Sequence, residues 1–220
     1  MIARVTVEAI GTALLLAIVV GSGIMGAKLA AGNDAVALLA NTMATGAGLF
    51  TLITMFAPIS GAHFNLAVTI AAVVQRLLTI KEAVAYVVAQ VAGACVGVIA
   101  AHAMFSLPLM QASGRARGTF GEFLGEVIAT FGLVLTIRIM GRAPLAHVAA
   151  AVALWITAAY WFTASTSFAN PAVTFARSLT DTFAGIASNN VAAFVVAQLI
   201  GMVLALLVGR FIAAPTRSAS

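Results

Sequence analysis

Two short segments, one in each half of the chain, place similar polar residues inside apolar surroundings. Residues 65–69 read Asn-Leu-Ala-Val-Thr and residues 170–174 read Asn-Pro-Ala-Val-Thr. Asn is a favoured helix N-cap and Pro is favoured at the first helical position, so each segment predicts the start of a helix. An Asn that caps the backbone with its carbonyl oxygen still has its amide group free to donate. The segments therefore predict hydrogen-bond donors for a passing polar solute, within two motifs: Asn65, Leu66 and Ala67, and Asn170, Pro171 and Ala172.

The composition places these motifs in a membrane. Of the 220 residues, 63% are hydrophobic and 8% are charged, whereas about a quarter of a soluble domain is charged. The segments at about 65–74 and 170–178 are too short to cross a bilayer and carry polar residues, which is typical of re-entrant half-helices. We expect an all-α membrane protein in contact with a lipid bilayer. Stretches of about 20 apolar residues predict six spans, at 5–24, 35–57, 83–105, 120–140, 145–164 and 190–213.

The distribution of Lys and Arg favours one orientation in the membrane. The positive-inside rule favours an N-terminus in the cytoplasm, and six spans then place both termini there. The net charge of +5 belongs to loop ends near lipid headgroups, and no basic cluster with interleaved aromatic residues indicates a nucleic-acid partner. On this assignment the cytoplasmic residues are Arg4, Arg76, Lys81, Arg138, Arg142, Arg210 and Arg217, and the outer ones are Lys28, Arg115, Arg117 and Arg177.

Further polar residues recur in the same order in both halves. A Glu-x-x-x-Thr motif opens the first span at Glu8 and returns at Glu126 in the fourth span. The sequence Val-Val-Ala-Gln ends at Gln90 in the third span and at Gln198 in the sixth. Because each half has three spans, the second copy enters the membrane from the opposite side, and the two Asn motifs are expected to meet at the midplane. We therefore expect an inverted 3+3 repeat whose copies are residues 1–110 and residues 111–220.

The repeated Glu and Gln residues need an explanation, because ionisable groups inside a membrane are costly. In the structural interpretation, Glu8 and Glu126 accept hydrogen bonds from the backbone of the nearby re-entrant loop, which has no water to satisfy it. The alternative is a proton relay. Gln90 and Gln198 are interpreted as hydrogen-bonding links between helices, with pore lining as the alternative.

Taken together, these residues resemble the aquaporin and aquaglyceroporin family over nearly the whole chain. The resemblance is carried by SGAHFNLAVT at 60–69, by SFANPAVT at 167–174 and by the repeated Glu and Gln positions. It implies a homotetramer in which each subunit has its own pore for water or small neutral solutes. One departure is Leu66 in place of the usual Pro, and because Asn65 still provides the cap, we expect the half-helix to form with slightly less stiffness.

A second departure concerns the outer filter of the pore. In the family an Arg usually follows the second motif and contributes to a narrow filter, whereas Val173 stands at that position here. The resemblance therefore implies a filter that is wider, less polar and less positive than one built from aromatic, His and Arg side chains. The family's spacing assigns the remaining filter positions to Thr45, to Ala158 or Ala159, and to Phe168 or Ser167.

Four other polar residues lie near the expected mouths of the pore or near helix ends. His63 precedes Asn65 as in the family's usual sequence, which assigns it to the cytoplasmic vestibule, with a packing role as the alternative. Arg177 lies one helical turn after Val173 on the same face, so it either reaches back toward the outer mouth or anchors at the headgroups. His102 and His147 lie near helix ends and are interpreted as residues of the membrane interface.

The resemblance thus implies a passive channel in the inner membrane of a bacterium, and we expect no metal site, no cofactor and no enzymatic activity. The small filter residues favour glycerol-like solutes over strict water selectivity, and a resemblance to members associated with arsenic resistance adds undissociated arsenite and methylated arsenicals. A water-selective channel is one alternative. A proton-coupled transporter that uses Glu8 or Glu126 is another. An intramembrane enzyme is disfavoured because no HExxH or convincing Ser or Asp pair is present.

Overall fold

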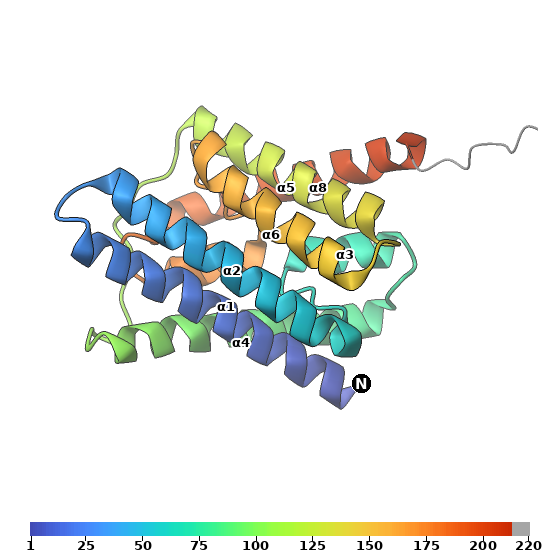
Figure 1. Ribbon diagram of the computed structural model, residues 1–220, viewed down its shortest axis with the longest axis horizontal. Coiled ribbons are helices and arrows are strands. Elements are labelled where there is room, and N and C mark those ends of the chain that lie inside the picture. Colours follow the sequence, from blue (N-terminus) through green and yellow to red (C-terminus); the bar gives the residue numbers. More distant parts are fainter. Residues whose placement is uncertain (213–220) are drawn as a thin grey trace, which may run out of the picture.

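The computed structural model describes residues 1–212 and contains eight helices in that range (Figure 1). Six of them are long and apolar enough to cross a membrane, which confirms the expected spans. The largest difference is in the first span, which continues to Leu29. Position 213 of the sixth expected span and Arg217 lie outside the described residues. The helices are α1 (Ile2–Leu29), α2 (Asp34–Ser60), α3 (Leu66–Val74), α4 (Ile80–Met104), α5 (Phe120–Met140), α6 (Leu145–Phe162), α7 (Pro171–Arg177) and α8 (Ser188–Ile212).

The starts of the long helices follow from local capping. Asn33 caps α2 by accepting from two backbone N–H groups. The helices α4 and α5 each begin with a capping box, formed by Thr79 with Glu82 and by Thr119 with Glu122. In such a box the Thr side chain accepts from the third helical N–H while the Glu side chain accepts from the backbone of the cap. These bonds fix the residues at which α2, α4 and α5 begin.

The six long helices form one bundle that encloses the two short ones. The helix α1 packs mainly against α4 and α2, α5 packs mainly against α8, and α2 packs against α6. Figure 1 shows the N-terminus at one end of the bundle and the turn between α1 and α2 at the other. We call these the N-terminal end and the far end. The short helices α3 and α7 contact each other and pack against α4 and α8, so both lie inside the bundle.

Glycines allow the closest of these helix contacts. A Cβ atom on Gly93 would collide with the backbone of α1 at Ala9, and one on Gly201 would collide with the backbone of α5 at Val127. Small residues let helix backbones approach closely in a membrane, where packing rather than water exclusion holds helices together. The pairs α1 with α4 and α5 with α8 therefore depend on these two glycines.

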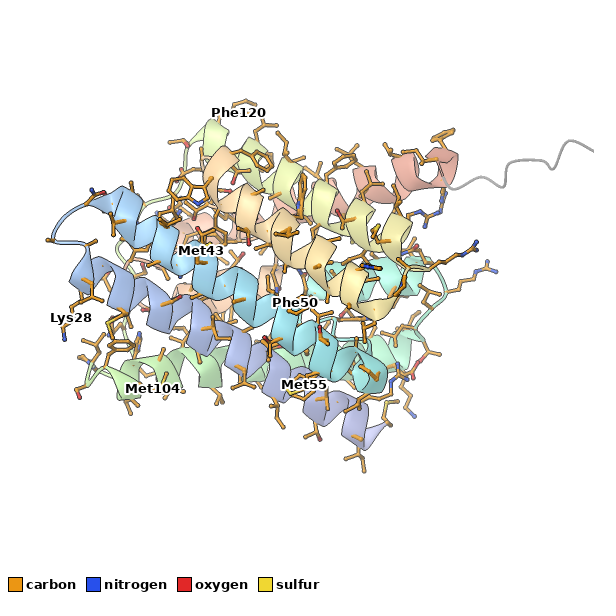
Figure 2. All side chains as sticks on the ribbon, viewed as in Figure 1. Lys28, Met43, Phe50, Met55, Met104 and Phe120 are labelled. Carbon is orange, nitrogen blue, oxygen red and sulfur yellow. The ribbon has the colours of Figure 1, made fainter. Side chains whose placement is uncertain are left out.

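The outer surface of the bundle is apolar. Figure 2 shows Met43, Phe50 and Met55 along α2, and all three side chains are exposed. Phe120, at the start of α5, is 79% exposed. Apolar side chains of this size are stable at an exposed surface when lipid rather than water covers it. This surface agrees with a multi-pass membrane protein.

Replacing Gly93 by Ala tests the close contact between α1 and α4. We expect Gly93→Ala to lower the free energy of unfolding by about 1–3 kcal/mol, because the added methyl group must displace the backbone of α1. Gly21→Ala is the matched control, since its Cβ would lie 3.5 Å from the Phe105 ring, an ordinary contact. Thermal unfolding of detergent-purified protein measures both. Equal unfolding temperatures for the two variants would contradict the role of Gly93.

Candidate functional site

Both short helices begin at an Asn cap in the interior of the bundle. The Oδ1 atom of Asn65 accepts from the backbone N–H of Ala67 at 2.8 Å, and Asn65 is only 6% exposed. The Oδ1 atom of Asn170 accepts from the backbone N–H of Ala172 at 3.0 Å. The helix start at Leu66 shows that Leu replaces Pro there without loss of the cap. Both helix N-termini, with their partial positive charge, therefore lie inside the protein.

The two Asn side chains also bind each other's loops. Asn65 Nδ2 donates to the carbonyl oxygen of Ala169 at 2.8 Å, and Asn170 Nδ2 donates to the carbonyl oxygen of Phe64 at 2.7 Å. Each of these carbonyls belongs to the residue just before the other Asn. One N–H of each amide is used in this crossed pair, so one N–H of each remains for a solute rather than the whole amide group.

A buried carboxylate supports each re-entrant loop. Glu8 accepts from the backbone N–H of His63 at 3.0 Å and of Phe64 at 2.8 Å. Glu126 accepts from the backbone N–H of Phe168 at 2.8 Å and of Ala169 at 2.8 Å. Both Glu side chains have no exposed surface. The four bonds satisfy backbone donors that water cannot reach, which is the structural rather than the proton-relay arrangement.

The loop backbone turns its N–H groups toward these carboxylates by adopting a left-handed conformation. Phe64 has a φ of 47° and Ala169 a φ of 48°, and Ala62 and Ser167 also have positive φ. Such angles cost a non-glycine residue about 1–3 kcal/mol. The sequence gives no sign of this strain, because no glycine stands at these four positions. The charged hydrogen bonds to the two Glu residues offset it.

Two Gln residues complete this support. Gln90 Nε2 donates to Glu8 at 2.9 Å and to the Thr69 hydroxyl at 2.9 Å. Gln198 Nε2 donates to Glu126 at 2.6 Å and to the Thr174 hydroxyl at 2.8 Å. Neither Gln side chain is exposed and neither lines the cavity described next. They link helices, and the alternative of pore lining is wrong.

A cavity runs past the crossed Asn pair and has mostly apolar walls. Its polar lining residues are few, so a solute that loses water on entering has few places to replace those hydrogen bonds. The apolar walls include Leu15, Val19, Leu49, Ile53, Val68, Leu133, Val134, Ile137, Val148, Val152 and Ile156. The polar or charged lining residues are Thr45, His63, Asn65, Gln75, Tyr160, Ser167, Asn170 and Arg177.

The structure corrects one expected filter position. Thr45 and Val173 line the cavity, but Ala158 is exposed on the outside of the bundle and Ala159 is buried without reaching the cavity. Tyr160 takes this place, with its hydroxyl 3.4 Å from the Thr45 hydroxyl. The residues of α6 that line the cavity, Val148, Val152, Ile156 and Tyr160, recur every four positions, so the helix face that continues to the filter carries Tyr160 and not Ala158 or Ala159.

The far end of the cavity carries a buried arginine. Arg177 lines the cavity, its Nε donates to the carbonyl oxygen of Ala184, and its guanidinium carbon lies 3.3 Å from the centre of the Phe168 ring. The alternative that Arg177 anchors at lipid headgroups is therefore wrong. Phe168 and Ser167 both line the cavity, so each of the two alternatives for the loop position contributes to it.

Arg117 is a second buried arginine near this ring, and its position could not be read from the sequence. It comes from the segment between α4 and α5, and its guanidinium carbon lies 5.0 Å from the Phe168 ring centre. Its side chain donates to the carbonyl oxygens of Gly185 at 3.0 Å and Ser165 at 3.1 Å. Burial lowers the pKa of Arg117 to about 10, so the group stays charged at neutral pH.

At the N-terminal end of the cavity, His63 lies against a polar cluster. Its Nδ1 is 3.1 Å from the Thr69 hydroxyl and its ring meets that of Tyr86 edge to face. Arg4 donates to the Tyr86 hydroxyl at 3.0 Å and pairs with Glu82 at 2.7 Å. His63 lines the cavity, so it both packs and borders the mouth.

The expectation that His102 lies at the membrane interface is wrong. Its side chain has no exposed surface, and its ring nitrogens lie 3.0 Å from the carbonyl oxygen of Leu109 and 2.8 Å from the Thr180 hydroxyl. The segments that follow α4 and α7 cover it, and a helix-end position in the sequence does not reveal that cover. His147, at the start of α6, is exposed.

Comparison with known proteins gives the family. The family profile described as Major intrinsic protein matches residues 1–143. The chain belongs to the major intrinsic protein family. The aquaglyceroporin AqpS of Rhizobium meliloti (strain 1021) is 51% identical over 214 residues, covering 97% of this chain and 91% of that relative. Aquaporin-1 of Homo sapiens is 33% identical, covering 97% of this chain and 83% of that relative.

A solved structure matches the fold of this major intrinsic protein along its length. The X-ray structure of the aquaglyceroporin from Plasmodium falciparum superposes with a TM-score of 0.76 at 22% identity, covering 96% of this chain and 97% of that one. At this identity the match shows the fold. The six spans and the two shorter interior helices are thus those of an aquaglyceroporin fold. Members of the family are transporters rather than enzymes.

Removing Glu126 tests whether the carboxylate holds the second loop. We expect Glu126→Ala to lower the free energy of unfolding by at least about 3 kcal/mol, because two backbone N–H groups and the Gln198 amide lose their acceptor. Glu122→Ala on the same helix is the control, since it removes a half-buried capping-box carboxylate and costs about 1 kcal/mol. Thermal unfolding in detergent compares them. If Glu126→Ala were as stable as Glu122→Ala, the support by Glu126 would be disproved.

Proposed function

We propose that the cavity is the pore of a passive channel for water and small neutral solutes, and that Asn65 and Asn170 are its central binding groups. The observation that carries the proposal is the crossed Asn pair, which leaves one amide N–H of each residue without a protein acceptor at a cavity with apolar walls. A solute oxygen can accept from both N–H groups as it passes. The names of the relatives, aquaglyceroporin and aquaporin, support this function.

The same geometry disfavours cations. The helices α3 and α7 both begin at the centre of the bundle, and the partial positive charge of a helix N-terminus repels cations and attracts lone pairs. The Oδ1 atom of each Asn already accepts from the backbone of its half-helix, so each Asn offers only an N–H donor to the cavity and a permeating water cannot donate to it. A chain of waters that passes protons is therefore interrupted there.

We further propose a preference for solutes with one polar and one apolar side, such as glycerol-like polyols, undissociated arsenite and methylated arsenicals. The polar residues His63, Asn65 and Asn170 face walls of Val, Leu and Ile. At the far end, the small residues Thr45 and Val173 leave room for a solute larger than water. Tyr160 narrows this filter and gives it one more hydroxyl than the Ala residues expected from the sequence would have.

The assembly belongs to the same proposal. The matching bonds of Glu8 and Glu126, and of Gln90 and Gln198, support an inverted repeat of residues 1–110 and 111–220. We propose a homotetramer in which each subunit has its own pore, as the resemblance to the family implies. We propose that it lies in a bacterial inner membrane with both termini in the cytoplasm, as the distribution of Lys and Arg favours.

Coupling to protons receives no support from the site. Glu8 and Glu126 have no exposed surface and do not line the cavity, so neither meets a solute on this path. Their oxygens already accept hydrogen bonds from the loop backbone, and protonation would remove acceptors that the loops require. Transport is expected to follow the solute gradient alone.

Stopped-flow permeability of proteoliposomes tests the filter at Val173. With the natural protein, we expect faster entry of water, glycerol and undissociated arsenite than into empty liposomes. Val173→Arg is expected to reduce glycerol and arsenite flux about tenfold or more while water still passes, because the longer, charged side chain would extend into the cavity that Val173 lines. Val173→Leu adds bulk without charge, so comparison of the two variants separates size from charge.

Two results would count against the proposal. Fast water flux with no glycerol or arsenite flux in the natural protein would instead support a water-selective channel. Uptake that saturates and requires a pH gradient would support a proton-coupled transporter. If both Val173 variants behaved like the natural protein, the filter would lie elsewhere along the cavity.

A further inference from the structure

The far end of the cavity contains a polar cluster that the passage of neutral solutes does not require. We call it the Arg177 cluster, and it consists of Arg177, Ser167, Phe168 and Arg117. Arg177 is 2% exposed and lines the cavity, and one of its N–H groups donates to the carbonyl oxygen of Ala184. Within residues 1–212, no protein oxygen accepts a hydrogen bond from its terminal amino groups. A guanidinium has five N–H donors, so several need an acceptor from within the cavity.

The charge of the cluster is also uncompensated. The guanidinium carbons of Arg177 and Arg117 lie 3.3 Å and 5.0 Å from the centre of the same Phe168 ring. Over the described part of the chain, the sole ion pair joins Arg4 to Glu82, at the N-terminal end of the bundle. No carboxylate is thus paired with either buried guanidinium. Two positive groups in a place of low polarity attract an anion more strongly than surface arginines do.

Ser167, the residue before Phe168, adds a second unpaired group to the cavity wall. Its hydroxyl oxygen is buried without a hydrogen-bond partner, the residue is 3% exposed, and it lines the cavity with Arg177. A buried hydroxyl without a partner is unusual in a folded protein and indicates that a water, ion or ligand completes it. The hydroxyl donates to an anion, as the guanidinium does.

We propose that the Arg177 cluster is a binding site for a small inorganic oxyanion of the phosphate type. A tetrahedral oxyanion can accept two parallel hydrogen bonds from the guanidinium of Arg177 and a third from Ser167, and the positive charge of Arg117, near the same Phe168 ring, strengthens the attraction. Val173, one turn earlier on the same face of α7, has no polar side-chain group, so it does not draw the anion away from Arg177. On the proposed function as a pore, the bound anion obstructs the far mouth and lowers the flux of neutral solutes.

Binding is measured on the full-length protein purified in detergent, by calorimetry with inorganic phosphate against chloride at equal ionic strength. We expect the natural protein to bind phosphate and to be stabilised against heat by it. Arg177→Met is expected to raise the Kd for phosphate at least about tenfold, and Ser167→Ala several-fold, because each removes a hydrogen bond to the anion. Arg115→Met is the matched control, since it removes the same charge from an exposed residue of the same end.

Three results would overturn the site. The first is equal heat stability and no heat of binding in phosphate and chloride for the natural protein. The second is an equal loss of binding in Arg115→Met and Arg177→Met, which would show that the general surface charge alone attracts the anion. The third is unchanged binding in Ser167→Ala, and this variant decides the question if Arg177→Met fails to fold.

The obstruction is tested separately in proteoliposomes. Phosphate added on the side of the far mouth is expected to lower water and glycerol flux at least several-fold in the natural protein, and to leave the flux of Arg177→Met unchanged. Binding without any fall in flux would overturn the obstruction. Phosphate binding by a protein that passes no neutral solute would disprove the proposed channel and leave the anion site standing.

Discussion

The structure depends on one requirement, that backbone N–H groups deep in a membrane must find acceptors inside the protein. The two re-entrant loops break the regular hydrogen bonding of helices where no water is available. Glu8 and Glu126 supply the missing acceptors, each for two consecutive backbone N–H groups. The left-handed residues before the Asn caps direct these N–H groups toward the carboxylates. The helix starts at the centre of the bundle, and hence the cavity beside them, follow from that arrangement.

The same requirement explains why the polar side chains of the interior have few unused hydrogen-bond donors and acceptors. Asn65 and Asn170 each cap a helix, bind the opposite loop and keep one N–H for the cavity. Because both side chains are held by two kinds of bonds, the orientation of the remaining donors is fixed before a solute arrives. The central site is therefore rigid, whereas the far mouth is bordered by loop residues. Differences in selectivity among related chains are expected to arise at that mouth.

Much of the fold could be predicted from the sequence, because spans and helix starts depend on local signals. Hydrophobic length predicted the six spans, and the Asn caps at Asn65 and Asn170 predicted the two short helices. The residues at the far mouth of the cavity were harder to predict, because their positions depend on the conformation of the loops. Tyr160 takes the place expected for Ala158 or Ala159 because it lies on the same face of α6 as Val152 and Ile156, a face that counting back from Asn170 missed. The burial of Arg117 and His102 was missed because loop residues distant in the sequence, such as Gly185 and Thr180, fold over them.

The crossed Asn pair also has a consequence for how the chain matures. Asn65 belongs to the half that leaves the ribosome first, and its amide partner is the Ala169 carbonyl, which is made much later. Until then, the amide of Asn65 in the first re-entrant loop lacks the Ala169 carbonyl as its acceptor. The pore is therefore complete only when the second half has packed against the first. A partly synthesised chain would have inserted helices but no complete pore.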